Sequence, residues 1–472
     1  MSQTVQETGL DRDRASELLP GFRGQAVLPG DEDYDEARKV WNGSIDRRPA
    51  AVLRCAGVAD VLAGLDVVRT LGLPVAVRGG GHNVAGFGTC DDGIVLDLSP
   101  MRSVQVDPQA RTARVEPGAV WAELDRETQA FALAVTGGVM STTGVAGFTL
   151  GGGIGWLQRK LGLACDNLRA AELVTADGTL VHASERDNPE LLWGLRGGGG
   201  NFGIVTSLEF DLHPIGPQVY SGLVAWPAAQ ARDVLAFFRD FTADAPDEVT
   251  AIAICRTAPP APFLPASVHG KAIVAIGACY AGPVADGEEA LAPLRAFGAP
   301  AGDALGPKPY TAFNAMFDGS WAPGYENYWK AEYLAGLPDA SLDVFADFAL
   351  RHTSPLSDFK LAHLGGAIAR VGEDDTAYGH RHAPYILNIN TRWADRDETD
   401  HHVAHTQQLW EAARPFSHGG AYTNFLGDEG VDRVRAAYGE ATFARLQALK
   451  QTYDPDNIFR LNQNIPPRAT GS

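Results

Sequence analysis

The chain has 472 residues, 45% of them hydrophobic, which is typical of a globular protein with two or three domains. It carries 39 basic and 58 acidic residues, giving a formal net charge of −19. Because this charge repels nucleic acids and anionic membranes, and no long Lys/Arg run offsets it, we expect neither as a partner.

The first half of the chain alternates short β-like runs with helical patterns. We predict a strand at 51–55, a helix at 58–72, a strand leading into a loop at 74–81, a strand at 93–99, and a strand followed by a helix at 113–128. Residues 170–184 predict a hairpin whose turn is Asp177-Gly178. The run between 136 and 168 is too rich in glycine for a regular element, so we expect it to wrap around a ligand.

The texture of the sequence changes after His213-Pro214. From about 215 to 410, glycine clusters stop and aromatic strands punctuated by proline alternate with helical stretches, which indicates a second domain. Its aromatic residues favour, only loosely, a flat or apolar substrate; they are Trp226, Tyr280, Tyr310, Phe313, Trp321, Tyr325, Tyr328 and Trp329.

The five cysteines are scattered and form no C-x-x-C pair, a pattern typical of reduced thiols. The N-terminal residues show no apolar targeting segment, and no run of about 18 apolar residues follows. We therefore expect a cytoplasmic protein that does not span a membrane.

Three glycine clusters, at 79–81, 151–153 and 197–200, suggest a phosphate cradle. A single triple glycine is most often a simple loop or turn. The 151–155 run follows no clear strand, so a Rossmann fingerprint is not satisfied, and no Walker loop is present. A cradle built from several loops remains, with His82 able to bind, to act as a nucleophile, or only to pack.

The run VRGGGHNVAGFG (77–88) resembles the pyrophosphate loop and covalent-histidine motif of FAD-linked oxidases of the vanillyl alcohol oxidase superfamily, in the berberine bridge enzyme-like branch. Further matching motifs lie at 33–50, 90–101, 142–168, 191–214 and 453–467. The resemblance covers nearly the whole chain and is strongest to bacterial enzymes that tailor natural products.

The resemblance implies an α+β fold in which a two-part FAD-binding domain of the p-cresol methylhydroxylase type carries an inserted α+β substrate domain built on an antiparallel sheet. The expected boundaries are an N-terminal tail at 1–20, the FAD-binding domain at 21–214, the substrate domain at 215–410, and a return to the FAD-binding domain at 411–472.

The resemblance also implies a set of FAD-binding residues, with His82 bonded covalently to the 8α-methyl group of the flavin. These residues are Arg78, Gly79, Gly80, Gly81, His82, Asn83, Thr143, Gly144, Gly147, Gly151, Gly153, Trp156, Asp166, Asn167, Gly200, Asn201, Gly203, Ile204, Asn462 and Asn464.

A second covalent link is not expected. Relatives with two links carry a cysteine where this chain has Met140, and a thioether cannot accept the flavin. Cys165 is a possible substitute, but we interpret it as a packed thiol. Thr143 falls where the family controls the access of oxygen to the flavin, and its small side chain permits oxidase behaviour.

Tyr422 and Asn424 resemble the Y-x-N motif of the family, so we predict Tyr422 as a base or hydrogen-bonding orienter supported by Asn424. The alternative is a tyrosine that fills the core of a strand. Alternation places Leu361, His363 and Gly365 on one strand face; if that face meets the flavin, His363 is a second proton-transfer candidate, and otherwise it is a structural histidine.

The leading function is a flavin oxidase that takes a hydride from an alcohol, amine or secondary-metabolite ring and passes the electrons to molecular oxygen, yielding H2O2. A dehydrogenase with another acceptor shares every motif. A flavoprotein that binds or reoxidises a drug-like compound for resistance, and an NAD-dependent enzyme, are further alternatives. We expect a monomer or homodimer. We expect no metal site, because the cluster of His401, His402 and His405 lacks a carboxylate or cysteine frame.

Overall fold

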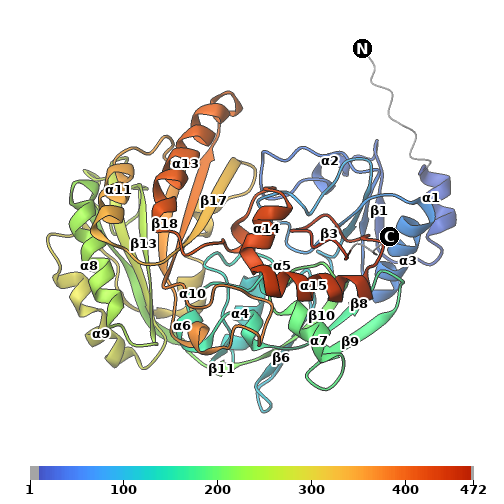
Figure 1. The fold of residues 1–472 in the computed structure, drawn as a ribbon, viewed down its shortest axis with the longest axis horizontal. Coiled ribbons are helices and arrows are strands. Elements are labelled where there is room, and N and C mark those ends of the chain that lie inside the picture. The colour runs from blue at the N-terminus through green and yellow to red at the C-terminus, as the bar shows by residue number, and fades with distance from the viewer. Residues whose placement is uncertain (1–9, 469–472) are drawn as a thin grey trace.

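The computed structural model describes residues 10–468 and has two lobes (Figure 1). One lobe contains β1–β11 and receives the C-terminal helices, and the other contains β12–β19. Residues 1–9 of the predicted tail lie outside the described part. The remainder of that tail forms α1 (Arg12–Leu18), whose Ala15 is buried against the core beside β2.

A four-stranded sheet positions the first glycine cluster. Its order is β1-β2-β4-β3, with β2 and β3 parallel to the central β4 and β1 antiparallel at the edge. Helix α3 (Val58–Leu71) packs on it and ends at Gly72, which adopts φ +63°. The strands are β1 (Gln25–Val27), β2 (Ala51–Arg54), β3 (Val75–Arg78) and β4 (Ile94–Asp97). The loop 79–83 therefore leaves the carboxyl end of a parallel strand.

A five-stranded antiparallel sheet forms the second part of this lobe, in the order β5-β6-β10-β8-β9. The predicted hairpin is confirmed, because β8 pairs with β9 and Gly178 in their turn adopts φ +84°. The strands are β5 (Val104–Asp107), β6 (Thr112–Val115), β8 (Leu168–Val174), β9 (Leu180–Ser184) and β10 (Ile204–Asp211). A short pair, β7 (Leu133–Ala134) and β11 (His213–Pro214), leads to the second lobe.

The second lobe is built on an eight-stranded antiparallel sheet, which confirms the predicted α+β fold with an antiparallel sheet. The strands are β12 (Gln218–Pro227), β13 (Val249–Thr257), β14 (Ala272–Tyr280), β15 (Gly302–Asp303), β16 (Gly306–Pro309), β17 (Glu326–Leu334), β18 (Asp358–His363) and β19 (Tyr385–Trp393).

Four helices cover the outer face of this sheet, and the inner face packs against the first lobe (Figure 1). The covering helices are α8 (Ala231–Ala243), α9 (Val284–Ala296), α11 (Asp339–Ala349) and α13 (Thr399–Ala413). Because side chains alternate along a strand, each strand supplies one set of residues to the helices and the other to the lobe interface.

The remaining helices are short or C-terminal. In the first lobe they are α2 (Tyr34–Ala37), α4 (Trp121–Gln129), α5 (Val145–Leu150), α6 (Gln158–Leu161) and α7 (Pro189–Leu195). The second lobe adds α10 (Tyr310–Asn314) and α12 (Ala367–Arg370), and the chain ends with α14 (Val431–Tyr438) and α15 (Glu440–Tyr453). Among residues 10–468, no helix combines the length and apolar character needed to cross a membrane.

The domain boundaries at 214 and 410 stay a prediction. The strands of the eight-stranded sheet run from Gln218 to Trp393, and α13 continues to Ala413. Helix α15 contacts α7, so the chain returns to the first lobe after the eight-stranded sheet.

A buried carboxyl group lies between the two lobes. Asp125 in α4 accepts a hydrogen bond from Nδ2 of Asn314 in α10 at 2.7 Å, and its Oδ1 has no partner among the described residues. The hydroxyl of Tyr310 is also buried without a partner. Burial raises the pKa of Asp125 to about 7, because the ionised form loses its hydration.

We expect Asp125→Asn to stabilise the protein more at pH 8 than at pH 5. The folded-state pKa lies above the unfolded value of 3.8, so stability falls as pH rises from 3.8 to about 7 and stays reduced above it. Asparagine retains the acceptor for Asn314 and removes this loss, which amounts to at most about 4 kcal/mol. Thermal unfolding of both proteins at the two pH values measures the effect, and an equal shift at both would contradict it.

Candidate active site

A cavity of about 280 Å³ lies where the two lobes and the C-terminal segment meet. Its walls come from loops rather than from one element, as the glycine clusters predict. The lining segments include 77–83, 138–140, 143–151, 199–203, 422–425 and 461–463, together with Trp329 of β17.

The loop 79–83 supplies unpaired donors to this cavity. Within the described part of the chain, none of the five backbone N–H groups from Gly79 to Asn83 donates to a protein acceptor. The guanidinium of Arg78 is occupied, because it donates to Ala37 O at 2.7 Å and to Asp97 Oδ2 at 2.8 Å. Arg78 therefore shapes the loop, and the backbone remains free to bind an anion.

Glycine is required where two of these loops meet. A Cβ atom built on Gly80 would lie 2.6 Å from the Cα of Gly144, which is too close for any real contact. Gly147 differs, because a Cβ there would meet no atom within 4 Å although the residue lines the cavity. Gly80 and Gly144 therefore let the two backbone segments approach closely, and Gly147 leaves space for a ligand.

His82 is half-buried at the cavity wall. Its imidazole stacks on the indole of Trp41 with ring centroids 4.6 Å apart and planes inclined by 21°, and Nε2 lies 3.5 Å from Thr142 Oγ1. Burial, followed by the positive charge of Arg392, lowers the pKa of His82 to about 4. The ring is therefore neutral at pH 7 and carries an unprotonated nitrogen.

Tyr422 and Asn424 are joined at the cavity. The Tyr422 hydroxyl accepts hydrogen bonds from the backbone N–H of Gly153 at 2.8 Å and from Asn424 Nδ2 at 2.7 Å. Asn424 Nδ2 also donates to Phe148 O at 2.9 Å. Burial raises the pKa of Tyr422, although these donors oppose the rise, so the phenol keeps its proton at neutral pH.

Sixteen of the FAD-binding and catalytic residues predicted from the sequence line this cavity. They are Arg78, Gly79, Gly80, Gly81, His82, Asn83, Thr143, Gly144, Gly147, Gly151, Gly200, Asn201, Gly203, Tyr422, Asn424 and Asn462.

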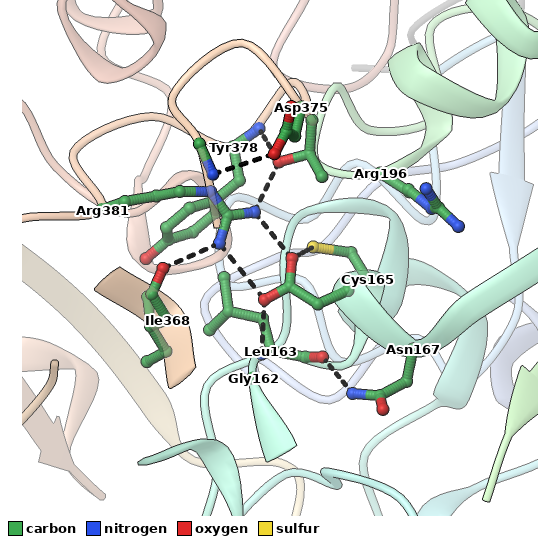
Figure 2. A network of polar contacts seen from close by, with 12 residues as sticks. Gly162, Leu163, Cys165, Asn167, Arg196, Ile368, Asp375, Tyr378 and Arg381 are labelled. Atoms are coloured by element: carbon green, nitrogen blue, oxygen red, sulfur yellow. Dashed lines mark hydrogen bonds and ion pairs between the residues drawn. The ribbon is translucent and has the colours of Figure 1, made fainter. Parts of the chain in front are cut away.

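Asp166 lies outside the cavity and holds the two lobes together. Its carboxylate binds Nη2 of Arg381 at 2.6 Å and Nη1 at 3.2 Å, and accepts the N–H of Leu163 at 2.8 Å (Figure 2). Arg381 also donates to Ile368 O at 3.2 Å. The expectation that Asp166 lines the FAD groove is therefore corrected, because its oxygens already have protein partners.

Five other expected FAD contacts also lie outside the cavity. Trp156 is fully buried and packs 4.7 Å from Phe313 of the second lobe, and Asn167 donates to the carbonyls of Leu161 and Leu163. Ile204, the first residue of β10, lies in a buried apolar cluster. Gly153 gives its N–H to Tyr422, and Asn464 is not in the wall.

His363 does not face the cavity. Its Nε2 accepts from Arg159 Nη1 at 3.0 Å, and its ring packs 5.5 Å from Tyr385 on the outer, helix-covered side of the sheet. Burial, and then the charge of Arg159, lower its pKa to about 3. The proton-transfer prediction for His363 is therefore wrong, because the opposite face of β18, with Ala362, packs on the first lobe.

The cavity wall contains Met140 and no thiol. The structure describes all five cysteines; each is buried, and none lines the cavity. Cys165 is next to Asp166, and burial raises its thiol pKa further above the ordinary range. These positions agree with the interpretation of Cys165 as a packed thiol.

Several residues of the cavity wall were not predicted from the sequence. Val139 and Phe425 lie beside predicted residues, but only Trp329 of the eight aromatic residues named for the second domain lines the cavity. Lys450 is fully buried outside it and donates to Asn201 O at 2.8 Å and Phe459 O at 2.9 Å. A lysine within a helical sequence pattern does not indicate that its side chain will be buried and will bind two backbone carbonyls.

The histidines of α13 do not form a metal cluster. His402 is buried, stacks on Trp393 at 5.0 Å and bonds Thr353 at 2.9 Å, so its ring has a structural role. Within residues 10–468, no group of three or more histidine, cysteine or acidic side chains is arranged to hold a metal ion.

Comparison with known proteins assigns the family. A family model described as FAD binding domain matches residues 49–184, and one described as berberine and berberine like matches 421–466. The chain is 30% identical to (R)-6-hydroxynicotine oxidase of Paenarthrobacter nicotinovorans over 95% of its own length and 98% of the relative. It belongs to the berberine bridge enzyme-like FAD-linked oxidoreductases. This family is part of the vanillyl alcohol oxidase superfamily.

Other relatives agree. An FAD-linked oxidoreductase of Dictyostelium discoideum is 30% identical over 96% of both chains. The crystal structure of 6-hydroxy-D-nicotine oxidase from Arthrobacter nicotinovorans superposes with a TM-score of 0.86 at 27% identity, covering 95% of this chain and 98% of that one. A berberine bridge enzyme-like protein of Physcomitrella patens shares the fold, with a TM-score of 0.86 at 24% identity over 96% and 99%.

The residues present fit FAD. The unpaired N–H groups of 79–83 suit a pyrophosphate, and the open space at Gly147 suits a large planar ligand. Asn462 Oδ1 is a buried acceptor without a partner among the described residues, so the wall also offers a site for a donor of the cofactor. The enzyme is an FAD-dependent oxidoreductase.

We expect Gly147→Ala to reduce FAD content without harming the fold. A Cβ at this helical position meets no protein atom, and alanine is favoured over glycine there by about 0.5–1 kcal/mol, but the methyl group enters ligand space. Gly306→Ala is the matched control, because its Cβ also meets nothing and it lies outside the cavity wall. Flavin absorbance per protein measures the effect; equal content in both variants would refute it.

Proposed function

We propose that the enzyme is an oxidase that takes a hydride from a small organic substrate, an alcohol, amine or secondary-metabolite ring, and passes the electrons to molecular oxygen. The observation that carries this proposal is the single cavity that joins the donor-rich loop of His82 to the hydroxyl of Tyr422. FAD supplies hydride acceptance when bound there. Named relatives include oxidases of nicotine-type and sugar substrates.

A single covalent link through His82 is part of the proposal. The imidazole is neutral, lies in the cavity wall and has an unprotonated nitrogen, which a nucleophile requires. Met140 occupies the wall at the position where a second, cysteine link would stand, and none of the five cysteines lines the cavity.

Tyr422 is proposed to orient the substrate rather than to act as a free base. Its oxygen accepts two hydrogen bonds, and its own hydrogen has no acceptor among the described residues, so the hydroxyl is free to donate into the cavity. Asn424 holds the phenol in place. Trp329 and Phe425 supply aromatic walls for an apolar or flat substrate.

The oxidase proposal is tested by mixing the enzyme anaerobically with alcohols, amines and phenols and then admitting oxygen to the mixture. We expect bleaching of the flavin by one of these classes, followed by recovery of colour with one H2O2 formed per substrate consumed. Bleaching without recovery in oxygen would favour a dehydrogenase. Tight binding of a compound without any bleaching would favour a binding or resistance protein.

Substitution of His82 tests the covalent link. We expect the wild type to retain its yellow colour in an acid-precipitated pellet, and His82→Ala to release its FAD into the supernatant, because alanine offers no nucleophile. The masses of the two denatured chains should differ by one bound FAD in addition to the substitution. Colour in the pellet of His82→Ala would show that another residue bears the link.

Substitution of Tyr422 tests the orienting hydroxyl. We expect Tyr422→Phe to slow anaerobic flavin reduction by about 10²-fold or more with little change in FAD content, since the ring still fills the wall. Tyr310→Phe is the control, because it removes a different buried hydroxyl, which has no partner among the described residues and lies outside the cavity. Equal rates for both variants would remove Tyr422 from the chemistry.

A further inference from the structure

Trp41 presents the face of its ring to His82. The stacking distance of 4.6 Å and interplanar angle of 21° place the two rings in a near-parallel arrangement. Trp41 also stacks with Trp321, with centroids 6.2 Å apart and planes again inclined by 21°. Trp329 of the cavity wall meets Trp41 edge-on at 5.7 Å. His82 therefore ends a short aromatic column at the cavity.

Hydrogen bonds fix Trp41 to both lobes. Its backbone N–H donates to Gly81 O, next to His82, at 3.0 Å, and its indole Nε1 donates to Trp321 O at 3.0 Å. The N–H of Gly324 donates to Trp41 O at 3.0 Å. The Trp41 ring consequently cannot shift unless the loop 79–83 or the segment 321–324 moves with it.

This stacking suits a nucleophilic imidazole. The lone pair of an imidazole nitrogen lies in the ring plane, so contact through the ring face fixes that plane and leaves the nitrogens unobstructed. The apolar indole also keeps water from one face of the ring and so favours the neutral form. Arg392, whose guanidinium lies 5.7 Å from the Trp41 ring, disfavours a second positive charge on His82.

We infer that Trp41 is a positioning residue for the covalent attachment of FAD, holding the His82 imidazole with a ring nitrogen directed at the 8α carbon. The inference rests on the proposed function, since it requires the His82 link. A C–N bond forms, one methyl C–H bond and the imidazole N–H bond break, and two protons leave. The two electrons enter the isoalloxazine, and dioxygen accepts them to give H2O2.

The inference is tested by Trp41→Leu and Trp41→Phe. We expect Trp41→Leu to bind FAD but to retain about tenfold less of it after acid precipitation, because the nucleophile is no longer aligned. Trp41→Phe restores a ring that can stack, so most of the covalent fraction should return even though the hydrogen bond to Trp321 is lost. Total FAD content and melting temperature are measured on the same samples.

Trp226→Leu is the matched control. Trp226 is fully buried in β12, and its Nε1 donates to Phe297 O at 3.0 Å, as Trp41 does to Trp321, but it lies in the helix-side core. We expect its FAD to remain fully covalent. A loss equal to that of Trp41→Leu would show a general effect of destabilisation and overturn the inference.

The remaining outcomes separate the inference from the function it rests on. If the wild type itself releases FAD in acid, the proposed His82 link is wrong and the role of Trp41 falls with it. If the wild type and Trp41→Leu both retain FAD fully, only the role of Trp41 is wrong. Equal losses in Trp41→Phe and Trp41→Leu would also overturn it, because the ring stack would not be the cause.

Discussion

The packing of the inner face of the eight-stranded sheet on the glycine-rich run of the first lobe determines the rest of the structure. Trp156 and Ile154 of that run lie in one apolar cluster with Ala362 and Ile386 of the sheet. The ion pair of Asp166 with Arg381 crosses the same interface with its groups buried, so removing either partner would leave an uncompensated charge. The cavity exists only while these surfaces are in contact.

Local sequence patterns predicted many of the elements, and the family resemblance supplied the residues expected around the cavity. The hairpin around Gly178 and the loop after β3 depend on residues close in the chain. The glycines at 79–81 indicate a loop whose backbone lines a ligand cavity. The family resemblance carried the assignment of FAD, because the glycine clusters alone left a simple turn open. The glycines of these clusters that line the cavity were therefore among the predicted residues.

Long-range pairing set the limit of prediction. Asp166 pairs with Arg381, which lies 215 positions away, and neither local sequence indicates that the two side chains meet. Alternation correctly separated His363 from Ala362 on β18, but it does not tell which face meets the flavin lobe. Trp41 was visible only as part of a motif, because its contact with His82 depends on how two distant loops fold together.

The two sides of the cavity follow different physical rules. The loop from Gly79 to Asn83 offers backbone N–H groups, which most changes of side chain elsewhere would leave in place. Other parts of the wall consist of side chains such as Trp329, Phe425 and Met140, whose shape and polarity change with every substitution.

This division agrees with relatives whose names carry different substrates, (R)-6-hydroxynicotine oxidase at 30% identity and chitooligosaccharide oxidase at 25%. A substitution of a side chain in the sheet or at 422–425 changes the shape of the wall and leaves the backbone N–H groups of 79–83 in place. Trp41 connects the two parts of the wall, since it stacks on His82 and also on Trp321 of the second lobe. Through it, a change in the second lobe would reach His82.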